Sequence, residues 1–384
     1  MIRASHAARP RSENVPAPVP MNGSRLIFAD VLNIVSCIAV VALHISVDVF
    51  NPRPTQDWIN SATMQAFNIF AIPIFFMISG MNLLAYRQKY DTWTFFRKRV
   101  WRTGKALLAG SIVCYLIYSS FPQSFYAADR FTTRSVIDFA KRFLTNDIND
   151  TYWFFYDIIY LYMLTPILSW LAEKKETLEY VIVVCFVVSV LFPFASWLGL
   201  SPKAYSTLFA WHLFTTPVLF FVGGYYIHRF GVFDRVPAWV SALVFLGMGA
   251  TMAFVSVWSN HYGNLGPDRP YNSYVISAGS LFAVIQAFSL FLFLRALEPL
   301  LRRLPNVAKR CIKALSGLSL GVYLYHVLVI NWTGMDLRMQ YPSMIVRLFV
   351  VYGITCLIVA AYRLVFGALK MALGVIRREI GNHA

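Results

Sequence analysis

The sequence predicts an all-α protein that crosses a membrane with about ten helices, and three observations support this. First, 58% of its 384 residues are hydrophobic and 14% are charged, whereas soluble domains carry about 25% charged residues. Second, the apolar residues gather in ten stretches of roughly the length that a membrane-spanning helix needs. Third, the lysines and arginines between these stretches are unevenly distributed, dense in some connecting segments and sparse in others.

The chain begins with a polar segment, residues 1–24, which is rich in Pro, Ala, Ser and Asn and lacks the apolar core of a signal peptide. We expect it to be a disordered tail. The ten apolar stretches then cover residues 26–49, 66–86, 104–121, 152–171, 179–198, 206–227, 237–258, 273–294, 314–333 and 344–366. The longest outer segment, 122–151, is too short for a separate domain. This predicts one membrane domain over residues 25–370 and a C-terminal tail over 371–384.

The basic residues indicate which side of the membrane each segment faces. If the N-terminus lies inside, 25 of the 34 Lys and Arg residues fall in inner segments and nine in outer ones. Because basic loops stay in the cytoplasm, we expect both termini there and an even number of spans. In a soluble protein the net charge of +16 would suggest nucleic acid, but this distribution favours a lipid bilayer and no nucleic-acid partner.

Four ionisable side chains are expected in the outer half of the membrane: His44, Asp157, His212 and His326. Their depth follows from helix rise along each predicted span. Ionisable groups inside a membrane are costly, and they often mark function. Histidine is the common general base and a carboxylate can orient it, so His44, His326 and Asp157 are catalytic candidates. The alternative is that each is a buried polar group held by a neighbouring helix.

A basic segment, FFRKRVWR at residues 95–102, follows the second stretch. If it is helical, Arg99 and Arg102 lie on one face at i, i+3. Arginine can bind phosphate oxygens with two parallel hydrogen bonds, so these residues would suit a donor such as coenzyme A. The alternative is an anchor for lipid headgroups.

The five cysteines give no sign of a cofactor site. Four lie in apolar stretches and one in a basic loop, and no pair is spaced as Cys-x-x-Cys. We therefore expect neither a bound metal nor a disulfide framework.

Five segments, in order along the chain, resemble motifs of the acyltransferase-3 family of bacterial membrane O-acyltransferases. They are RLIFADVLNIVSCIAVVALH (25–44), AIPIFFMISGMNLL (71–84), FFRKRVWR (95–102), YWFFYDIIYLYMLTPIL (152–168) and SGLSLGVYLYHVLVI (316–330). Together they extend over nearly the whole predicted membrane domain. The fourth segment looks closest to a subgroup whose members include acetyltransferases of cell-surface polysaccharides.

This resemblance implies a reaction and a set of roles. Members of the family move acyl groups, usually acetyl from acetyl-coenzyme A, onto hydroxyls of surface carbohydrates. By resemblance, His44 would be the catalytic histidine, and Arg99 with Arg102 would hold the donor's phosphates. The acceptor would be a surface glycan or a lipid-linked saccharide, and the protein would lie in the bacterial inner membrane.

Two positions depart from the family's pattern. Many members have Arg eleven residues before the first-helix His, where this chain has Asn33; an asparagine there can hydrogen-bond to a donor but cannot neutralise its charge. Many members also have Glu five residues after the fourth-helix Trp, where this chain has Ile158 beside Asp157. One helical step turns by about 100°, so Asp157 does not simply replace that Glu.

Two other functions compete with an acetyltransferase. A transporter or exporter of a lipid-linked sugar would also place polar groups near the membrane midplane, but the sequence shows no inverted repeat and no matching pair of Gly- or Pro-broken helices. A non-enzymatic sensor or scaffold would leave the basic loop and the histidines unexplained. With the alternatives weighed, the resemblance implies a membrane O-acetyltransferase that uses acetyl-coenzyme A.

Overall fold

The computed structural model describes residues 25–53, 55–122, 131, 134–200, 214–260 and 271–382, with 369–382 as backbone only. Over these residues the chain is helical and contains no strand, which confirms the predicted all-α fold class. The expected disordered tail, residues 1–24, and the candidate His212 lie outside the described residues.

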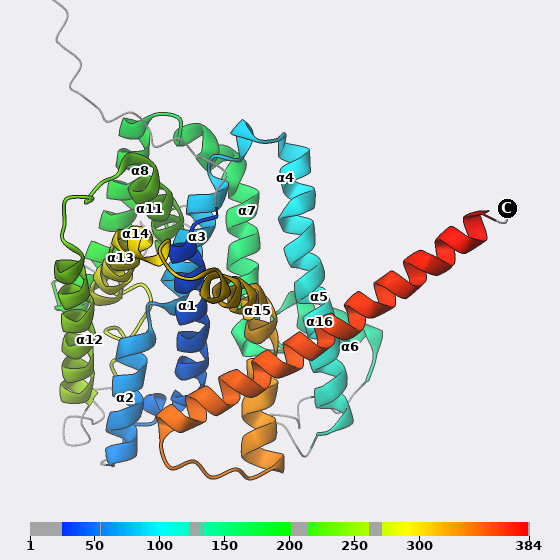
Figure 1. The fold of residues 1–384 in the computed structure, drawn as a ribbon. Helices are drawn as coiled ribbons and strands as arrows, with labels where there is room; N and C mark the ends of the chain where they lie inside the picture. The colour runs from blue at the N-terminus through cyan, green and yellow to red at the C-terminus, as the bar shows by residue number, and fades with distance from the viewer. Residues whose placement is uncertain are drawn as a thin grey trace, which may run out of the picture.

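The helices follow one another in a bundle that Figure 1 shows from the side. They are α1 (Ile27–Ile45), α2 (Gln56–Asn68), α3 (Ala71–Leu83), α4 (Thr92–Lys98), α5 (Val100–Ser120), α6 (Val136–Leu144), α7 (Trp153–Leu171), α8 (Lys175–Phe186), α9 (Phe192–Trp197), α11 (Thr216–Phe230), α12 (Ala238–Asn260), α13 (Leu281–Ala296), α14 (Glu298–Leu301), α15 (Asn306–Asn331) and α16 (Met344–Asn382). The last helix continues beyond residue 370, and its C-terminal part extends away from the rest of the bundle (Figure 1).

Eight helical segments among the described residues are long and apolar enough to cross a membrane. They cover Ile27–Ile45, Gln56–Gln88, Thr92–Ser120, Asp150–Leu171, Lys175–Trp197, Ala238–Asn260, Asn306–Asp336 and Met344–Ala368. The two other predicted spans fall on α11 and α13, which have 15 and 16 residues. Helices of that length extend about 23–24 Å, less than the roughly 30 Å of a hydrocarbon core.

Helix α13 is shorter than its apolar stretch because a turn precedes it. Ser280 is the N-cap: its Oγ accepts the N–H of Ala283 and donates to the carbonyl of Val275. The helix therefore begins at Leu281, whereas hydropathy had predicted a start at residue 273. An N-cap serine supplies an acceptor that the first helical turn otherwise lacks, and it fixes the boundary here.

The second predicted span is interrupted near its start. Helix α2 ends at Asn68, and α3 starts at Ala71. Pro73 has no backbone N–H, so it cannot bond to the carbonyl of Ile69, four residues earlier. The break between the two helices lies at this position, and the helical segment starts at Gln56 rather than at the predicted residue 66.

Helices α3 and α11 touch through their backbones at two glycines. A Cβ added at Gly80 would lie 1.7 Å from the carbonyl oxygen of Phe221, and one added at Gly224 would lie 2.3 Å from the carbonyl oxygen of Met77. Small residues permit this close approach, which helps helices associate in a bilayer. The contact fixes α3, a wall of the site described below, against the buried helix α11.

Helix α1 lies in the middle of the bundle and packs against α2, α3, α15 and α16 (Figure 1). Its first turn is held by Glu298 at the start of α14, whose carboxylate accepts the backbone N–H groups of Ile27 (3.3 Å) and Phe28 (2.7 Å). A carboxylate at this position also interacts favourably with the helix dipole. The central helix is therefore anchored at the end where the chain enters the bundle.

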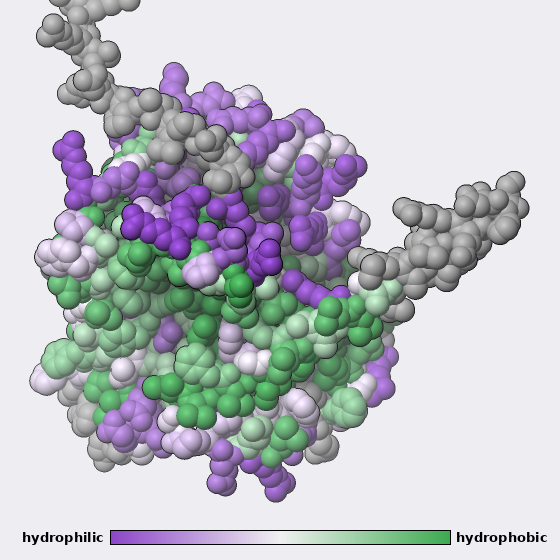
Figure 2. All heavy atoms as spheres, viewed as in Figure 1, coloured by the Kyte–Doolittle hydropathy of each residue, from purple (hydrophilic) through white to green (hydrophobic). Residues whose placement is uncertain are grey.

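The surface divides into an apolar belt and a basic end. Large apolar side chains are exposed on α5, α7, α12 and α16, as expected for faces that contact lipid. Figure 2 shows hydrophilic residues gathered over the end of the bundle where α4 and α14 lie. We call this the basic end, because the Lys- and Arg-rich segments 87–105 and 295–313 lie there.

Candidate functional site

Two of the predicted catalytic histidines are in contact. His44 lies one residue before the end of α1, and His326 lies on α15, which packs along α1. His326 Nε2 is 3.1 Å from His44 Nδ1, and the ring centroids are 4.9 Å apart. His326 is 0% exposed, while His44 is partly buried. We call these two residues the histidine pair.

The neighbours of the histidine pair determine where its protons lie. His326 Nδ1 is 2.8 Å from the carbonyl oxygen of Tyr323 and 3.1 Å from that of Val322, and a carbonyl can only accept. His326 Nδ1 therefore carries a proton, and in the neutral ring Nε2 is an acceptor. His44 Nδ1 faces two acceptors, that Nε2 and the carbonyl oxygen of Val40 at 2.8 Å. His44 Nδ1 is then the protonated nitrogen.

This leaves His44 Nε2 without a proton and without a hydrogen bond to any described residue. An imidazole nitrogen in that state is a base, and a proton that it accepts makes the Nδ1–H a stronger donor to its partner. The histidine pair can therefore take up one proton and share the resulting charge across two rings.

The third catalytic candidate, Asp157, is not part of this arrangement. It lies on α7 and has no hydrogen bond or ion pair within the described part of the chain. The histidine pair is oriented by backbone carbonyls, which fill the place that we had expected a carboxylate to take. The neighbouring Ile158, 3% exposed, faces a cavity instead.

Gln65 and Ser46 hold the backbone around His44. Gln65 Nε2 on α2 donates to the carbonyl of Leu43 (2.7 Å) and to Ser46 Oγ (3.0 Å), and Ser46 Oγ donates to the carbonyl of Ala42 (2.7 Å). These bonds satisfy carbonyls that a helix end leaves free, and they fix the chain on both sides of His44. Gln65 was not among the predicted site residues. Its signal in the sequence is an amide directly before the apolar stretch 66–86.

A cavity of about 220 Å³, here called the inner pocket, lies within the bundle. Helices α1, α3, α5, α7 and α15 line it through Asn33, Phe75, Ile78, Ser79, Thr103, Phe154, Phe155, Ile158, Tyr162, Ser316, Gly317, Ser319, Leu320 and Tyr323. The ring of Tyr323 also contacts that of His326, with centroids 5.8 Å apart. The inner pocket therefore approaches the histidine pair, and most of its polar lining was not predicted.

Asn33 lies in the wall of the inner pocket and belongs to a chain of hydrogen bonds. Its Nδ2 donates to the carbonyl oxygen (2.9 Å) and to Oγ (3.0 Å) of Ser316 on α15. Ser316 Oγ donates in turn to Asp30 Oδ1 (2.7 Å), and Asp30 forms a two-bond ion pair with Arg25 (2.5 and 2.6 Å). This chain leads from the basic end to the inner pocket.

The two candidate donor-binding arginines lie in different environments. Arg99 forms the junction between α4 and α5, is half-buried, and its Nε has no hydrogen-bond partner among the residues that the structure describes. It is near enough to Tyr162, in the wall of the inner pocket, for an electrostatic interaction. Arg102 is exposed on the first turn of α5. The helix has a break at Arg99, between α4 and α5, and neither arginine is part of the lining of the inner pocket.

One comparison with known proteins gave a match. A family model described as an acyltransferase domain, Acyl_transf_3, matches residues 26–364. Searches of curated proteins and of solved structures gave no significant match. The matched region contains the histidine pair, the inner pocket and both arginines.

Proposed function

Because the chain belongs to the Acyl_transf_3 family and is a multi-pass membrane acyltransferase, we propose that it moves an acetyl group from acetyl-coenzyme A to a hydroxyl group. The acceptor is a surface glycan or a lipid-linked saccharide. The observation that carries the proposal is the histidine pair, in which His44 Nε2 is free to take a proton. A hydroxyl group needs such a base to attack a thioester at neutral pH.

In the proposed reaction His44 Nε2 accepts the proton of the acceptor hydroxyl as its oxygen attacks the thioester carbonyl. The tetrahedral intermediate then expels the thiolate, and His44 returns the proton to the thiolate sulfur. While His44 carries the extra proton, its Nδ1–H donates to His326 Nε2, 3.1 Å away. Charge-assisted bonds of this kind are about twice as strong as neutral ones, so His326 stabilises the charged state.

The inner pocket suits the pantetheine arm of the donor. Eleven residues separate Asn33 from His44, which corresponds to about 16 Å along α1. An extended pantetheine arm, about a dozen bonds from phosphate oxygen to sulfur, reaches roughly 15 Å with standard bond lengths. Asn33 Oδ1 can accept an amide N–H of that arm, whereas Arg99 and Arg102 are proposed to contact phosphate.

The charge distribution supports an orientation in the bacterial inner membrane. We place the basic end and both termini in the cytoplasm, where acetyl-coenzyme A is made, because basic segments are retained there. Asn264→Cys should then react with an impermeant thiol reagent added outside intact cells, and Asn306→Cys should not. The reverse labelling pattern would contradict this orientation.

Incubation with labelled acetyl-coenzyme A tests the function. Purified protein in liposomes, supplied with a glycan-containing membrane extract, should release free coenzyme A and move label into saccharide. His44→Ala should release none above background. If folded wild-type protein binds coenzyme A but yields neither thiol nor labelled product, it is not an acetyltransferase for this donor.

A further inference from the structure

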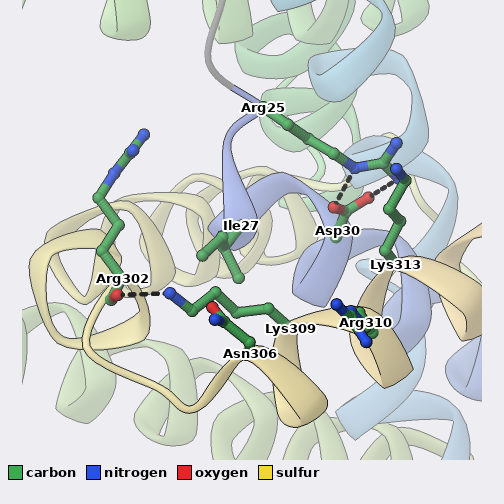
Figure 3. Close-up of a pocket in the computed structure, with 8 residues that line it drawn as sticks. All are labelled: Arg25, Ile27, Asp30, Arg302, Asn306, Lys309, Arg310 and Lys313. Atoms are coloured by element: carbon green, nitrogen blue, oxygen red, sulfur yellow. Dashed lines mark hydrogen bonds and ion pairs between the residues drawn. The ribbon is translucent and has the colours of Figure 1, made fainter.

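A second cavity, of about 490 Å³, opens at the basic end, and Figure 3 shows its walls. We call it the basic pocket. It is formed by the start of α1, the residue after α14 and the first two turns of α15, through Arg25, Ile27, Asp30, Arg302, Asn306, Lys309, Arg310 and Lys313. Its volume lies in the range of small-molecule sites, about 300–1,000 Å³.

The basic pocket carries more positive charge than its own carboxylates balance. Arg25 is paired with Asp30, Arg302 is paired with Glu298 (2.8 Å), and Lys309 Nζ donates to the carbonyl of Arg302 (3.1 Å). The two remaining cations, Arg310 and Lys313 on α15, have no partner within the described part of the chain.

Those two cations, Arg310 and Lys313, lie at i, i+3 with Lys309 at i−1, so all three share one side of α15. Like charges on one helix face repel each other unless an anion lies between them. The same helix begins at Asn306 without a side-chain cap, and free N–H groups at a helix start also favour an anion. The chemistry of the pocket thus fits a phosphate group.

The lining residues are charged at their ends and apolar along their stems. Seven of the eight are polar or charged and Ile27 is the single apolar one, yet most of the exposed lining surface is apolar because Lys and Arg expose their aliphatic stems. The charged ends suit a phosphate group, and the stems suit an apolar or aromatic group attached to it. Among such esters the proposed function supplies a nucleotide phosphate, and a lipid headgroup is the outcome that the test below distinguishes.

The basic pocket is connected to the inner pocket through side chains. Asp30 belongs to the wall of the first and Asn33 to the wall of the second, one helical turn further along α1. The hydrogen bonds Asp30–Ser316 and Ser316–Asn33 join them directly. An anion that draws Arg25 away from Asp30 would therefore change the wall of the inner pocket as well.

From this geometry we propose that the basic pocket binds the phosphorylated nucleotide part of the donor, whose pantetheine arm continues into the inner pocket. The identity of the ligand rests on the proposed function, but phosphate binding by the pocket does not. Coenzyme A carries a diphosphate and a separate 3′-phosphate, so Arg99, which interacts with Tyr162 in the wall of the inner pocket, can hold one group while the basic pocket holds the other.

The test compares ligands and variants in phosphatidylcholine nanodiscs by calorimetry. The double variant Arg310→Gln/Lys313→Gln should bind coenzyme A at least about tenfold more weakly, because it lacks two charge-assisted contacts. Its affinity for pantetheine, which has no phosphate, should be unchanged. The matched control Arg235→Gln/Arg303→Gln removes two cations outside the pocket and should bind coenzyme A normally.

Three results would overturn the proposal: normal coenzyme A binding by the double variant, an equal loss in the control, or an equal loss for pantetheine. Native mass spectrometry tests whether the basic pocket binds a lipid instead. If the double variant binds coenzyme A normally but no longer retains phosphatidylglycerol, the pocket holds a lipid headgroup and the nucleotide assignment is wrong.

The same measurements separate this inference from the proposed function. Loss of coenzyme A affinity in the double variant, with no acetyl transfer by the wild type, would keep the phosphate site and exclude the acetyltransferase. If the double variant transfers acetyl groups and binds coenzyme A with normal affinity, the protein is an acetyltransferase and the phosphate site is excluded. Arg310→Lys, which keeps the positive charge, should bind coenzyme A more tightly than the double variant does. A folding defect would not explain this difference.

Discussion

The histidine pair predicts unequal losses for its two members. His44→Ala removes the base itself, and general-base catalysis contributes about 10²–10⁴-fold. His326→Ala removes only the acceptor, 3.1 Å away, for the Nδ1–H of protonated His44. His44 keeps its other acceptor, the carbonyl of Val40 at 2.8 Å, so the required tautomer survives.

The size of the second loss follows from the bond that disappears. A hydrogen bond to a charged group contributes about 1.5–3 kcal/mol, which corresponds to roughly 10–150-fold in rate. We expect His326→Ala to lose activity in this range. His326→Gln should lose less, because its amide oxygen can accept the same proton. His44→Gln should be as inactive as His44→Ala.

The assay is release of free thiol from acetyl-coenzyme A in liposomes with a glycan-containing membrane extract. Rates are compared at equal amounts of protein that unfolds at the wild-type temperature. Equal losses in His326→Ala and His44→Ala would mean that His326 transfers the proton itself. Full activity of folded His44→Ala would refute the assignment of the base.

Three further predictions concern the walls of the site. Gly80→Ala should lower the unfolding temperature in detergent, because its Cβ would lie 1.7 Å from a carbonyl oxygen of α11, whereas Gly104→Ala, with nothing within 4 Å, should not. Arg99→Ala should weaken coenzyme A binding about tenfold or more in calorimetry, and Arg99→Lys should recover only part. Asn33→Arg should destabilise the folded protein by roughly 1–3 kcal/mol, because Asn33 is partly buried and loses its two hydrogen bonds to Ser316. Adding Ile158→Glu should recover part of this loss, and additive losses in denaturant unfolding would count against the pairing.

Composition and hydropathy predicted the fold class because lipid imposes a simple rule on sequence. Every span must be apolar and helical to satisfy its backbone, and that pattern is visible without tertiary information. The rule does not predict where a helix starts or is interrupted, because packing or a single side chain determines these positions. Ser280 sets the start of α13 at Leu281, and Pro73 removes a backbone hydrogen bond at the break between α2 and α3.

The candidate site was predictable in depth but not in contacts. Helix rise placed His44 and His326 at similar depth, but their contact joins residues 282 apart in sequence and depends on how α1 and α15 pack. Asp157 is partly buried and is not part of the lining of the inner pocket, whereas its neighbour Ile158 is. Hydropathy gives depth along a helix, whereas the face that a residue presents depends on its neighbours.

The two departures from the family's pattern are best understood together. Many members carry Arg at the position of Asn33 and Glu at the position of Ile158, and both positions line the inner pocket of this chain. A buried charge is tolerated when it is paired and costly when it is alone. Loss of the positive group would therefore favour loss of the negative one, which leaves a pocket of neutral polar and aromatic side chains. If the donor is coenzyme A, as we propose, such a pocket would suit its uncharged amide arm better than its phosphates, which agrees with the proposal that cations at the basic end bind the phosphates.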